Sequence, residues 1–341
     1  MTEFPLPPGV AERALTLSVS GIDIPAALTS PPGAPTGAVL LIPGSLFCDV
    51  NGDFPAWKAY PRVYAWLAQQ LAERGMVVYR FAKLGPGTGS VDRDPEQAKA
   101  VKTWTGREVI ARGALAQFRA ELAAMGHAAL PLVLAGHSEG AVVAAVLGRS
   151  GVNADGIALL SGPSVGILSI MIEQSAAMTP PGSDGTAHQA LLDVVACLRE
   201  GRAIGDELKA RASGPFGAGA LVSMPPEAQR YMAECDATDP CAAIAAYDGP
   251  VLVVQGGIDS SVPTHHAHAL RAARGARPTA YAFFAELQHC YKRIPEGTPP
   301  QQVFGLAGPC DERVAATIAE FTAARAPRAA PHAGGAASPT R

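Results

Sequence analysis

The sequence predicts an α/β protein with a mostly parallel central sheet and helices on both faces of that sheet. The first observation is a series of short runs that are apolar throughout, as in strands buried on both faces. The second is that segments of helical periodicity alternate with these runs, which is typical of parallel strands joined by crossover helices. The third is a polar–apolar alternation near the start, which indicates a hairpin at one edge of the sheet.

The predicted elements begin with an antiparallel hairpin over residues 14–28, whose turn is placed at Gly21-Ile22. Strands are predicted at 38–42, 76–81, 130–135, 156–160, 251–255 and 279–284, the first of them buried on both faces. Helices are predicted at 57–74, 107–125, 141–147 and 313–324. The first helix is expected to end at Gly75, because glycine readily adopts the left-handed conformation that closes a helix.

Residues 165–248 interrupt this rhythm, because they contain helical patterns but no clear buried strand. We interpret them as a helical lid inserted into an α/β core formed by residues 1–164 and 249–326. Residues 327–341 consist mainly of Ala, Pro, Gly, Ser and Arg, a composition that predicts a disordered tail.

Composition excludes several classes of protein. Hydrophobic residues make up 48% of the 341 residues, enough for a large buried core, and the net charge of −3 argues against a nucleic-acid partner. The start of the chain lacks the basic and apolar regions of a signal peptide. No apolar run reaches about 18 residues, so no membrane insertion is expected. A cytoplasmic location is the default expectation, and the oligomeric state, monomer or dimer, stays open.

The six cysteines are scattered along the chain and show neither a CxxC pattern nor the Cys/His spacing of a zinc site. Cys235 and Cys241 are close enough in sequence to pair in an oxidising compartment. Free thiols in a reducing compartment are the favoured interpretation.

The strongest motif is Gly-X-Ser-X-Gly at 136–140, centred on Ser138. An apolar strand precedes it and an apolar helix follows, the context in which a tight turn presents a serine hydroxyl above the sheet. The small flanking glycines let the strand and the helix approach closely, and the helix N-terminus supports negative charge nearby. Ser138 is therefore the predicted nucleophile.

A serine nucleophile needs a base, and the base needs a carboxylate that orients it. Asp259 follows the apolar strand 251–255 and a glycine turn, so it is expected at the carboxyl edge of the sheet, where ligands bind. A mere turn-forming role is the alternative for Asp259. His289 follows the last strand and is the preferred base, because the loop there can return over Ser138. The other histidines considered lie in the presumed lid or in the helix after Asp259: His188, His265, His266 and His268.

An oxyanion hole requires two backbone N–H donors directed at the developing negative charge. One is expected from Glu139, directly after the nucleophile. The other is expected from Ser45, in the loop after strand 38–42, with Leu46 as the alternative. His137, beside the nucleophile, is expected to pack rather than to act as the base.

Together, the segments 41–45 (Leu-Ile-Pro-Gly-Ser), 136–140 and 255–263 and the late His289 resemble the α/β-hydrolase superfamily. The resemblance covers roughly residues 14–325 and is greatest to the bacterial serine esterase and dienelactone-hydrolase-like branch with an inserted helical lid. It implies the α/β-hydrolase fold and a carboxylic-ester hydrolase that works through an acyl-enzyme, without metal or cofactor. Many relatives have a histidine where this chain has Pro43, which affects the identity of the oxyanion donor.

The expected substrates are small to medium acyl esters. The same three residues would also serve an acyl thioesterase, a lactonase or an amidase, and the motifs do not separate these activities. A catalytically dead hydrolase fold that binds a ligand is the alternative from another class. It predicts a broken triad, whereas Ser138, Asp259 and His289 are all present.

Overall fold

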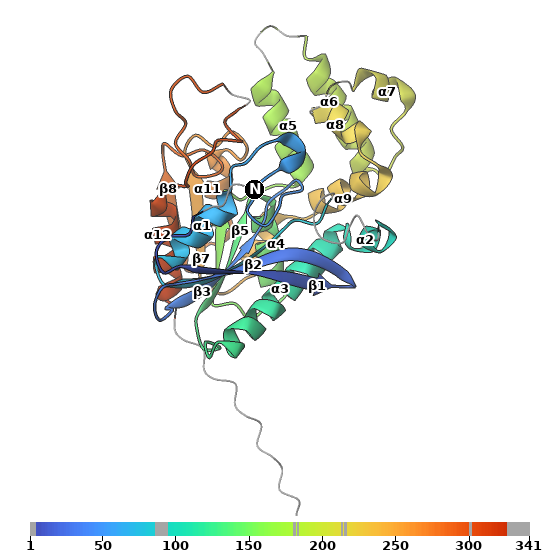
Figure 1. Cartoon of the computed structure of the whole chain (residues 1–341). Helices are drawn as coiled ribbons and strands as arrows, with labels where there is room; N and C mark the ends of the chain where they lie inside the picture. The colour runs from blue at the N-terminus through green and yellow to red at the C-terminus, as the bar shows by residue number, and fades with distance from the viewer. Residues whose placement is uncertain are drawn as a thin grey trace, which may run out of the picture.

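The computed structural model describes residues 5–85, 95–179, 182, 184–212, 214, 217–299 and 302–325. Within these residues the chain forms one eight-stranded sheet in the order β1-β2-β4-β3-β5-β6-β7-β8 (Figure 1). The strands are β1 (Ala11–Val19), β2 (Ile22–Ser30), β3 (Gly37–Ile42), β4 (Met76–Phe81), β5 (Leu132–His137), β6 (Gly156–Leu160), β7 (Val251–Gly256) and β8 (Thr279–Phe284). Strands β3 to β8 are parallel, and the β1–β2 hairpin joins antiparallel at the edge. The predicted sheet is confirmed.

Helices cover both faces of the sheet, and the alternation of side chains along β3 shows how. Val39 and Leu41 belong to the core beneath α1 (Val63–Ala72) and α12 (Glu312–Ala323). Leu40 and Ile42 point the other way, into the core beneath α3 (Trp104–Ala124), α4 (Glu139–Arg149) and α11 (Thr264–Ala273). Strands β3 to β7 are therefore buried on both sides, which is why their sequences are largely apolar, whereas β1 and β8 are partly exposed.

Six helices lie between β6 and β7 and form what we name the helical insertion, residues 165–248. They are α5 (Ile167–Met178), α6 (Thr186–Arg199), α7 (Asp206–Arg211), α8 (Gly217–Ser223), α9 (Pro226–Asp236) and α10 (Pro240–Ala245). Helices α5 to α8 stand together at the top of the view in Figure 1, and Leu168, Leu191 and Leu221 belong to a separate hydrophobic cluster there. Helix α10 packs instead against α4 and α11 of the core.

The hairpin turn lies one residue earlier than predicted. Val19 pairs with Ile22, so the turn residues are Ser20 and Gly21, and both have positive φ (51° and 77°). A two-residue turn in which both residues have positive φ has a backbone twist that matches the twist of the two strands it joins. Glycine at its second position is the usual choice there, which places Gly21 inside the turn rather than at its start.

The helix predicted at 57–74 begins later, at Val63. Residues 55–57 form a short 3-10 helix, η1 (Pro55–Trp57), and Arg62 has φ 52°, outside the right-handed helical region. The backbone N–H of Arg62 donates to the Asp53 carboxylate at 2.8 Å, which fixes this non-helical entry. The predicted end of this helix, residue 74, lies two residues beyond the observed end at Ala72. Gly75 has φ 84°, the left-handed conformation expected for it.

Helix α3 starts earlier than predicted, because Thr103 caps it by accepting a hydrogen bond from the Gly106 N–H at 2.9 Å. The short helix α2 (Pro95–Val101) before it was not predicted. The tail predicted at 327–341 lies outside the described residues.

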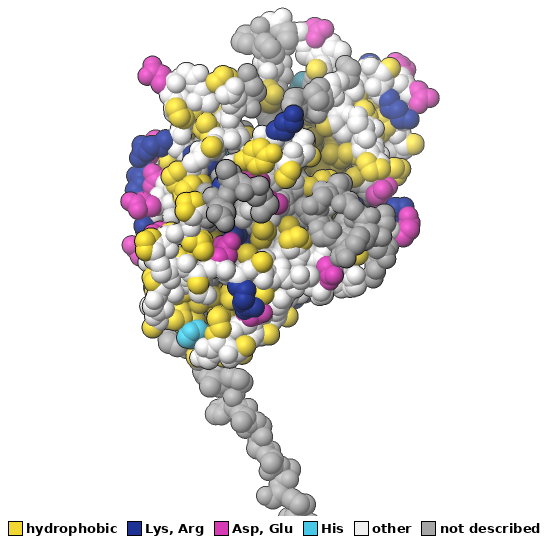
Figure 2. Space-filling model, in the orientation of Figure 1, with side chains coloured by type: hydrophobic (Ala, Val, Ile, Leu, Met, Phe, Trp, Pro, Cys, Tyr) yellow, Lys and Arg dark blue, Asp and Glu magenta, His cyan; other side chains and the backbone are white. Residues whose placement is uncertain are grey.

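None of the helices in the described part of the chain combines the length and apolar character needed to cross a bilayer. All six cysteines are free thiols, so Cys235 and Cys241 are not paired. On the face shown in Figure 2, charged side chains of both signs lie scattered among hydrophobic ones.

Candidate active site

Ser138 occupies a strained turn between β5 and α4, with φ 56° and ψ −124°. This conformation depends on the two flanking glycines. A Cβ atom on Gly136 would lie 2.0 Å from the carbonyl oxygen of Gly140, and one on Gly140 would lie 2.2 Å from the carbonyl oxygen of Ile42. Both contacts are with backbone, so no side-chain movement would relieve them. The glycines of the motif are thus required by the close approach of strand and helix.

The turn holds Ser138 half-buried at the carboxyl edge of the sheet. Its backbone N–H donates to the carbonyl of Leu160 at 2.8 Å, at the end of the neighbouring strand β6. Within the described residues its hydroxyl makes no hydrogen bond, so the Ser138–His289 contact that proton transfer requires is not formed here. Catalytic hydrogen bonds of this kind often tighten only when substrate is bound.

The structure brings Asp259 and His289 together at the same edge. Asp259 follows β7, and its Oδ1 accepts hydrogen bonds from the backbone N–H groups of Ser261 (2.9 Å) and Val262 (2.8 Å). Its Oδ2 lies 2.8 Å from Nδ1 of His289, in the loop after β8. Burial raises the pKa of Asp259, but His289 and the hydrogen bonds to the carboxylate outweigh burial and lower it. An ionised carboxylate only accepts, so His289 carries its proton on Nδ1 and leaves Nε2 free as a base.

His137 is buried beside this pair and links it to the loop after β3. The Gly44 N–H donates to Tyr64 Oη at 2.7 Å, and the Tyr64 hydroxyl lies 3.2 Å from His137 Nδ1. His137 Nε2 lies 3.0 Å from the carbonyl oxygen of His289. Burial and the neighbouring His289 lower the pKa of His137 to about 3, so its ring is neutral. The prediction that His137 packs is right about burial but missed this hydrogen-bonded chain.

The loop after β3 passes close to Ser138. A Cβ atom on Gly44 would lie 3.0 Å from the Cβ of Ser138. The Gly44 N–H is occupied by Tyr64, whereas the Ser45 N–H has no acceptor among the described residues. The Glu139 N–H begins helix α4, and first-turn N–H groups have no partner within a helix. These two donors therefore remain available beside Ser138.

A buried charged cluster, which sequence reasoning missed, surrounds the Glu139 side chain. Its Oε1 lies 2.7 Å from Lys83 Nζ, 3.3 Å from Arg107 Nε and 2.7 Å from the hydroxyl of Tyr231. We name these four residues the Glu139 cluster. Burial raises the pKa of Glu139, but the positive charges of Lys83 and Arg107 outweigh burial and lower it to about 2. The carboxylate is therefore ionised although its side chain is only 2% exposed.

The Glu139 cluster also holds the loop beside Ser138. The Arg107 guanidinium donates to the carbonyl oxygens of Pro43 and Gly44, the second at 3.4 Å. Because the Ser45 N–H follows directly, these bonds fix the direction in which it points. Tyr231 lies on α9, so the helical insertion contributes one member of the cluster.

Asp259 makes a hydrogen bond with no other described histidine. His188 Nδ1 lies 3.1 Å from Ser175 Oγ within the helical insertion. His265 and His266 contact Glu173, and the His268 ring lies 5.8 Å from the ring of Tyr281. The choice of His289 over these four therefore agrees with the geometry.

Cys290 stands next to His289 but is a packing residue. It is 1% exposed, and burial together with Cys310 raises the pKa of its thiol to about 12. A thiol with such a pKa is not a nucleophile at neutral pH.

We expect iodoacetamide to label Cys241 first in the native protein, because Cys241 is the only half-exposed cysteine. Cys290 should be labelled only after unfolding. Mass spectrometry of timed samples measures both rates, and rapid native labelling of Cys290 would contradict its assignment to the core.

The strand order, the serine turn and the positions of Asp259 and His289 define an α/β-hydrolase fold. Comparison with solved structures gives the same result. A lipase in its open form is 18% identical, with a TM-score of 0.53 over 92% of this chain and 100% of that one. The esterase domain of a Rhodothermus marinus protein is 13% identical, with a TM-score of 0.51 over 92% and 99%. Dienelactone hydrolase from Anabaena variabilis is 13% identical, with a TM-score of 0.50 over 93% and 99%.

No protein-family model and no curated protein matches the sequence. At these identities the structural likeness concerns the fold. It confirms the predicted α/β-hydrolase fold with esterases, lipases and a dienelactone hydrolase among its structural neighbours.

Proposed function

We propose that this protein is a serine hydrolase that cleaves carboxylic esters through an acyl-enzyme. The Ser138 oxygen attacks the acyl carbon while its proton passes to Nε2 of His289, and Asp259 stabilises the imidazolium that forms. The alcohol leaves with that proton, and the acyl group remains as an ester on Ser138. Water then attacks this ester with His289 again as the base, which releases the acid.

The N–H groups of Ser45 and Glu139 donate hydrogen bonds to the carbonyl oxygen and stabilise the negative charge that develops on it. Both donors are fixed in place before substrate arrives, one through Arg107 and the other by the start of α4. Donors that need no reorganisation during the reaction provide a large share of catalysis in such sites.

One observation carries the proposal: the 2.8 Å contact between His289 Nδ1 and Asp259 Oδ2 at the sheet edge that also presents Ser138. A dead ligand-binding fold has no need of this pair. The fold neighbours include proteins titled esterase, lipase and dienelactone hydrolase, which agrees with ester hydrolysis.

We further propose that the helical insertion acts as a lid that selects small to medium acyl esters. Apolar side chains that include Val142, Val165 and Ile167 line a small cavity between the insertion and the core, beside Glu139. The cavity holds about 10 Å³, room for one water molecule, so an acyl chain would enter only when the insertion moves away from the core. The free thiols agree with a cytoplasmic location.

A two-part experiment tests the function. A fluorophosphonate probe should label the protein at Ser138 alone, as found by peptide mass spectrometry. Rates over p-nitrophenyl esters of rising acyl length should be highest for the short and medium chains. A faster thioester, lactone or amide in the same series would reassign the bond that is cut. Absence of both labelling and hydrolysis would favour the dead fold.

A further inference from the structure

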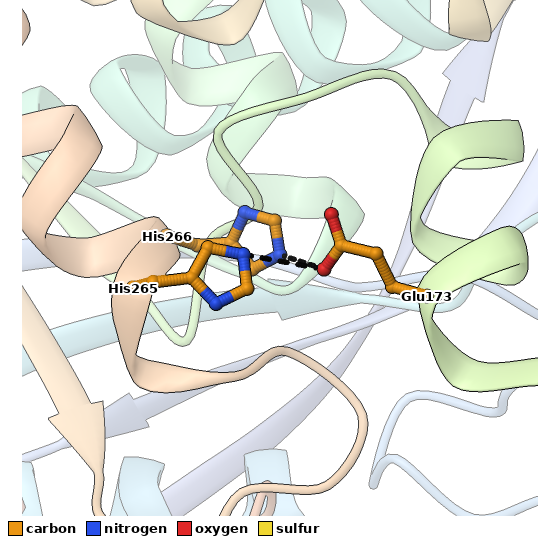
Figure 3. A group of neighbouring side chains, drawn as sticks. All are labelled: Glu173, His265 and His266. Carbon is orange, nitrogen blue, oxygen red and sulfur yellow. Dashed lines mark hydrogen bonds and ion pairs between the residues drawn. The ribbon is translucent and has the colours of Figure 1, made fainter. Parts of the chain in front are cut away.

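Glu173, His265 and His266 converge at the junction between the helical insertion and the core, away from the Glu139 cluster. Glu173 lies on α5, and the two histidines are neighbours at the start of α11. Figure 3 shows all three side chains pointing toward one another. Glu173 Oε2 lies 2.9 Å from Nε2 of His266 and 3.2 Å from Nε2 of His265, and all three ligand atoms lie within 4.8 Å of one another.

These spacings fit a divalent metal ion. Ligand atoms about 2.0–2.2 Å from zinc are separated from one another by about 2.9–3.4 Å at the usual bond angles. Two imidazoles and one carboxylate are a common ligand set for zinc. Short-range sequence motifs for metal sites could not reveal this one, because its ligands come from segments about ninety residues apart.

The burial of the three side chains differs in a way that suits a metal site. The His266 side chain is fully buried, whereas those of His265 and Glu173 are 61% and 35% exposed. One ligand is thus rigidly held, and the other two face solvent, from which an ion can enter. Solvent would supply the fourth ligand.

Ser164 provides the outer contact that a metal-bound histidine usually has. Its hydroxyl lies 2.8 Å from His266 Nδ1, and its backbone N–H donates to the same atom at 3.3 Å. In the metal-free form Nδ1 therefore accepts, and Nε2–H donates to Glu173. When a metal takes Nε2, the proton moves to Nδ1 and is accepted by the Ser164 hydroxyl oxygen, and the Ser164 N–H gives up its longer hydrogen bond to Nδ1.

We propose that Glu173, His265 and His266 form a site for a divalent transition metal of the zinc type, which fastens α5 of the helical insertion to α11 of the core. The site is separate from the proposed ester hydrolysis, because none of its ligands belongs to the proposed triad or donates to the oxyanion. It lies beside another link between the same two parts, the 2.8 Å hydrogen bond from Gln174 Nε2 to the Ser261 carbonyl.

Calorimetric titration of the chelator-treated full chain with Zn²⁺ tests the site. We expect one equivalent to bind, and Co²⁺ to give the visible absorption of a low-coordinate nitrogen–oxygen site. Glu173→Gln and His265→Ala should each weaken binding more than about 100-fold, because each removes a direct ligand. Ser164→Ala should weaken it about tenfold, as the loss of an outer contact does.

His268→Ala is the matched control, since His268 is exposed on the same helix but contacts Tyr281 instead. It should bind Zn²⁺ like the wild type. Hydrogen exchange gives the second measurement: Zn²⁺ at 100 times its Kd should suppress opening of α5 about 100-fold. The proposal is overturned if the wild type binds no Zn²⁺ at millimolar concentration. It would also be overturned if Glu173→Gln and His265→Ala bound Zn²⁺ as tightly as the wild type, or if Zn²⁺ left the hydrogen exchange of α5 unchanged.

Discussion

Ser138→Ala should lower kcat/KM for a p-nitrophenyl ester about a million-fold, as loss of the nucleophile does in serine hydrolases. This corresponds to about 8 kcal/mol of transition-state stabilisation. The residual rate should come from substrate binding and the two oxyanion donors, which the substitution leaves in place. Steady-state kinetics, together with loss of fluorophosphonate labelling, measure the effect.

Two further variants separate chemistry from folding. Ser150→Ala alters an exposed serine at the far end of the same helix α4 and should keep full activity. Ser138→Gly should be as inactive as Ser138→Ala but more stable than it, by about 1–2 kcal/mol, because only glycine adopts φ 56° and ψ −124° without strain. An active Ser138→Ala enzyme would remove Ser138 from the mechanism.

Most of the sheet could be predicted from sequence because the inner parallel strands, β3 to β7, are buried on both faces and therefore largely apolar. The limits of the strands at 156–160 and 279–284 agree with those of β6 and β8. The prediction was wrong at the start of α1, where apolar residues continue a helical pattern that Pro61 and the left-handed Arg62 interrupt. Backbone conformation at one residue is not encoded in hydrophobic periodicity, so this error is of a general kind.

The proposed triad could be located because strand ends in a parallel sheet meet at one edge, which places Ser138, Asp259 and His289 together. The Glu139 cluster was missed, since Lys83, Arg107 and Tyr231 are separated by up to 148 residues. One indication was available. A charged residue directly after the nucleophile, at the start of an apolar helix, is buried and needs partners of opposite charge. Lys83, two residues after the apolar strand 76–81, was the nearest candidate at that edge.

Glu139→Gln should destabilise the protein by about 3–5 kcal/mol, because it removes the negative charge that pairs with the buried Arg107 cation and with Lys83. The backbone N–H of residue 139 is retained, so any loss of rate reports on the side chain. With Arg107 less firmly held, the Ser45 N–H loses its fixed direction. We expect kcat to fall about 10- to 100-fold with little change in KM, less than removal of a whole oxyanion donor. Chemical denaturation and steady-state kinetics measure the two effects.

The pH dependence of the free energy of unfolding at acid pH provides a second test of Glu139. Its pKa is about 2 in the folded protein and about 4.3 in an unfolded chain. Between these values the unfolded chain binds the proton first, so wild-type stability falls as the pH drops from about 4.5 toward 2. Glu139→Gln lacks this contribution, and its stability curve should be flatter over that range.

Two variants define what Glu139 itself provides. Tyr231→Phe removes the hydrogen bond to the carboxylate and the one that the hydroxyl accepts from Lys83 at 3.3 Å, but it leaves Glu139 paired with both cations, so it should cost about 1.5–3 kcal/mol. Asp206→Asn breaks the exposed pair with Lys209 and should cost at most about 1 kcal/mol. If Glu139→Gln proved as mild as Asp206→Asn, the cluster would not be a buried charge network. If it destabilised the protein without lowering kcat, Arg107 would not position the oxyanion loop. A loss of both stability and kcat is expected because one carboxylate, at the start of α4, pairs with the Arg107 guanidinium that holds the oxyanion loop.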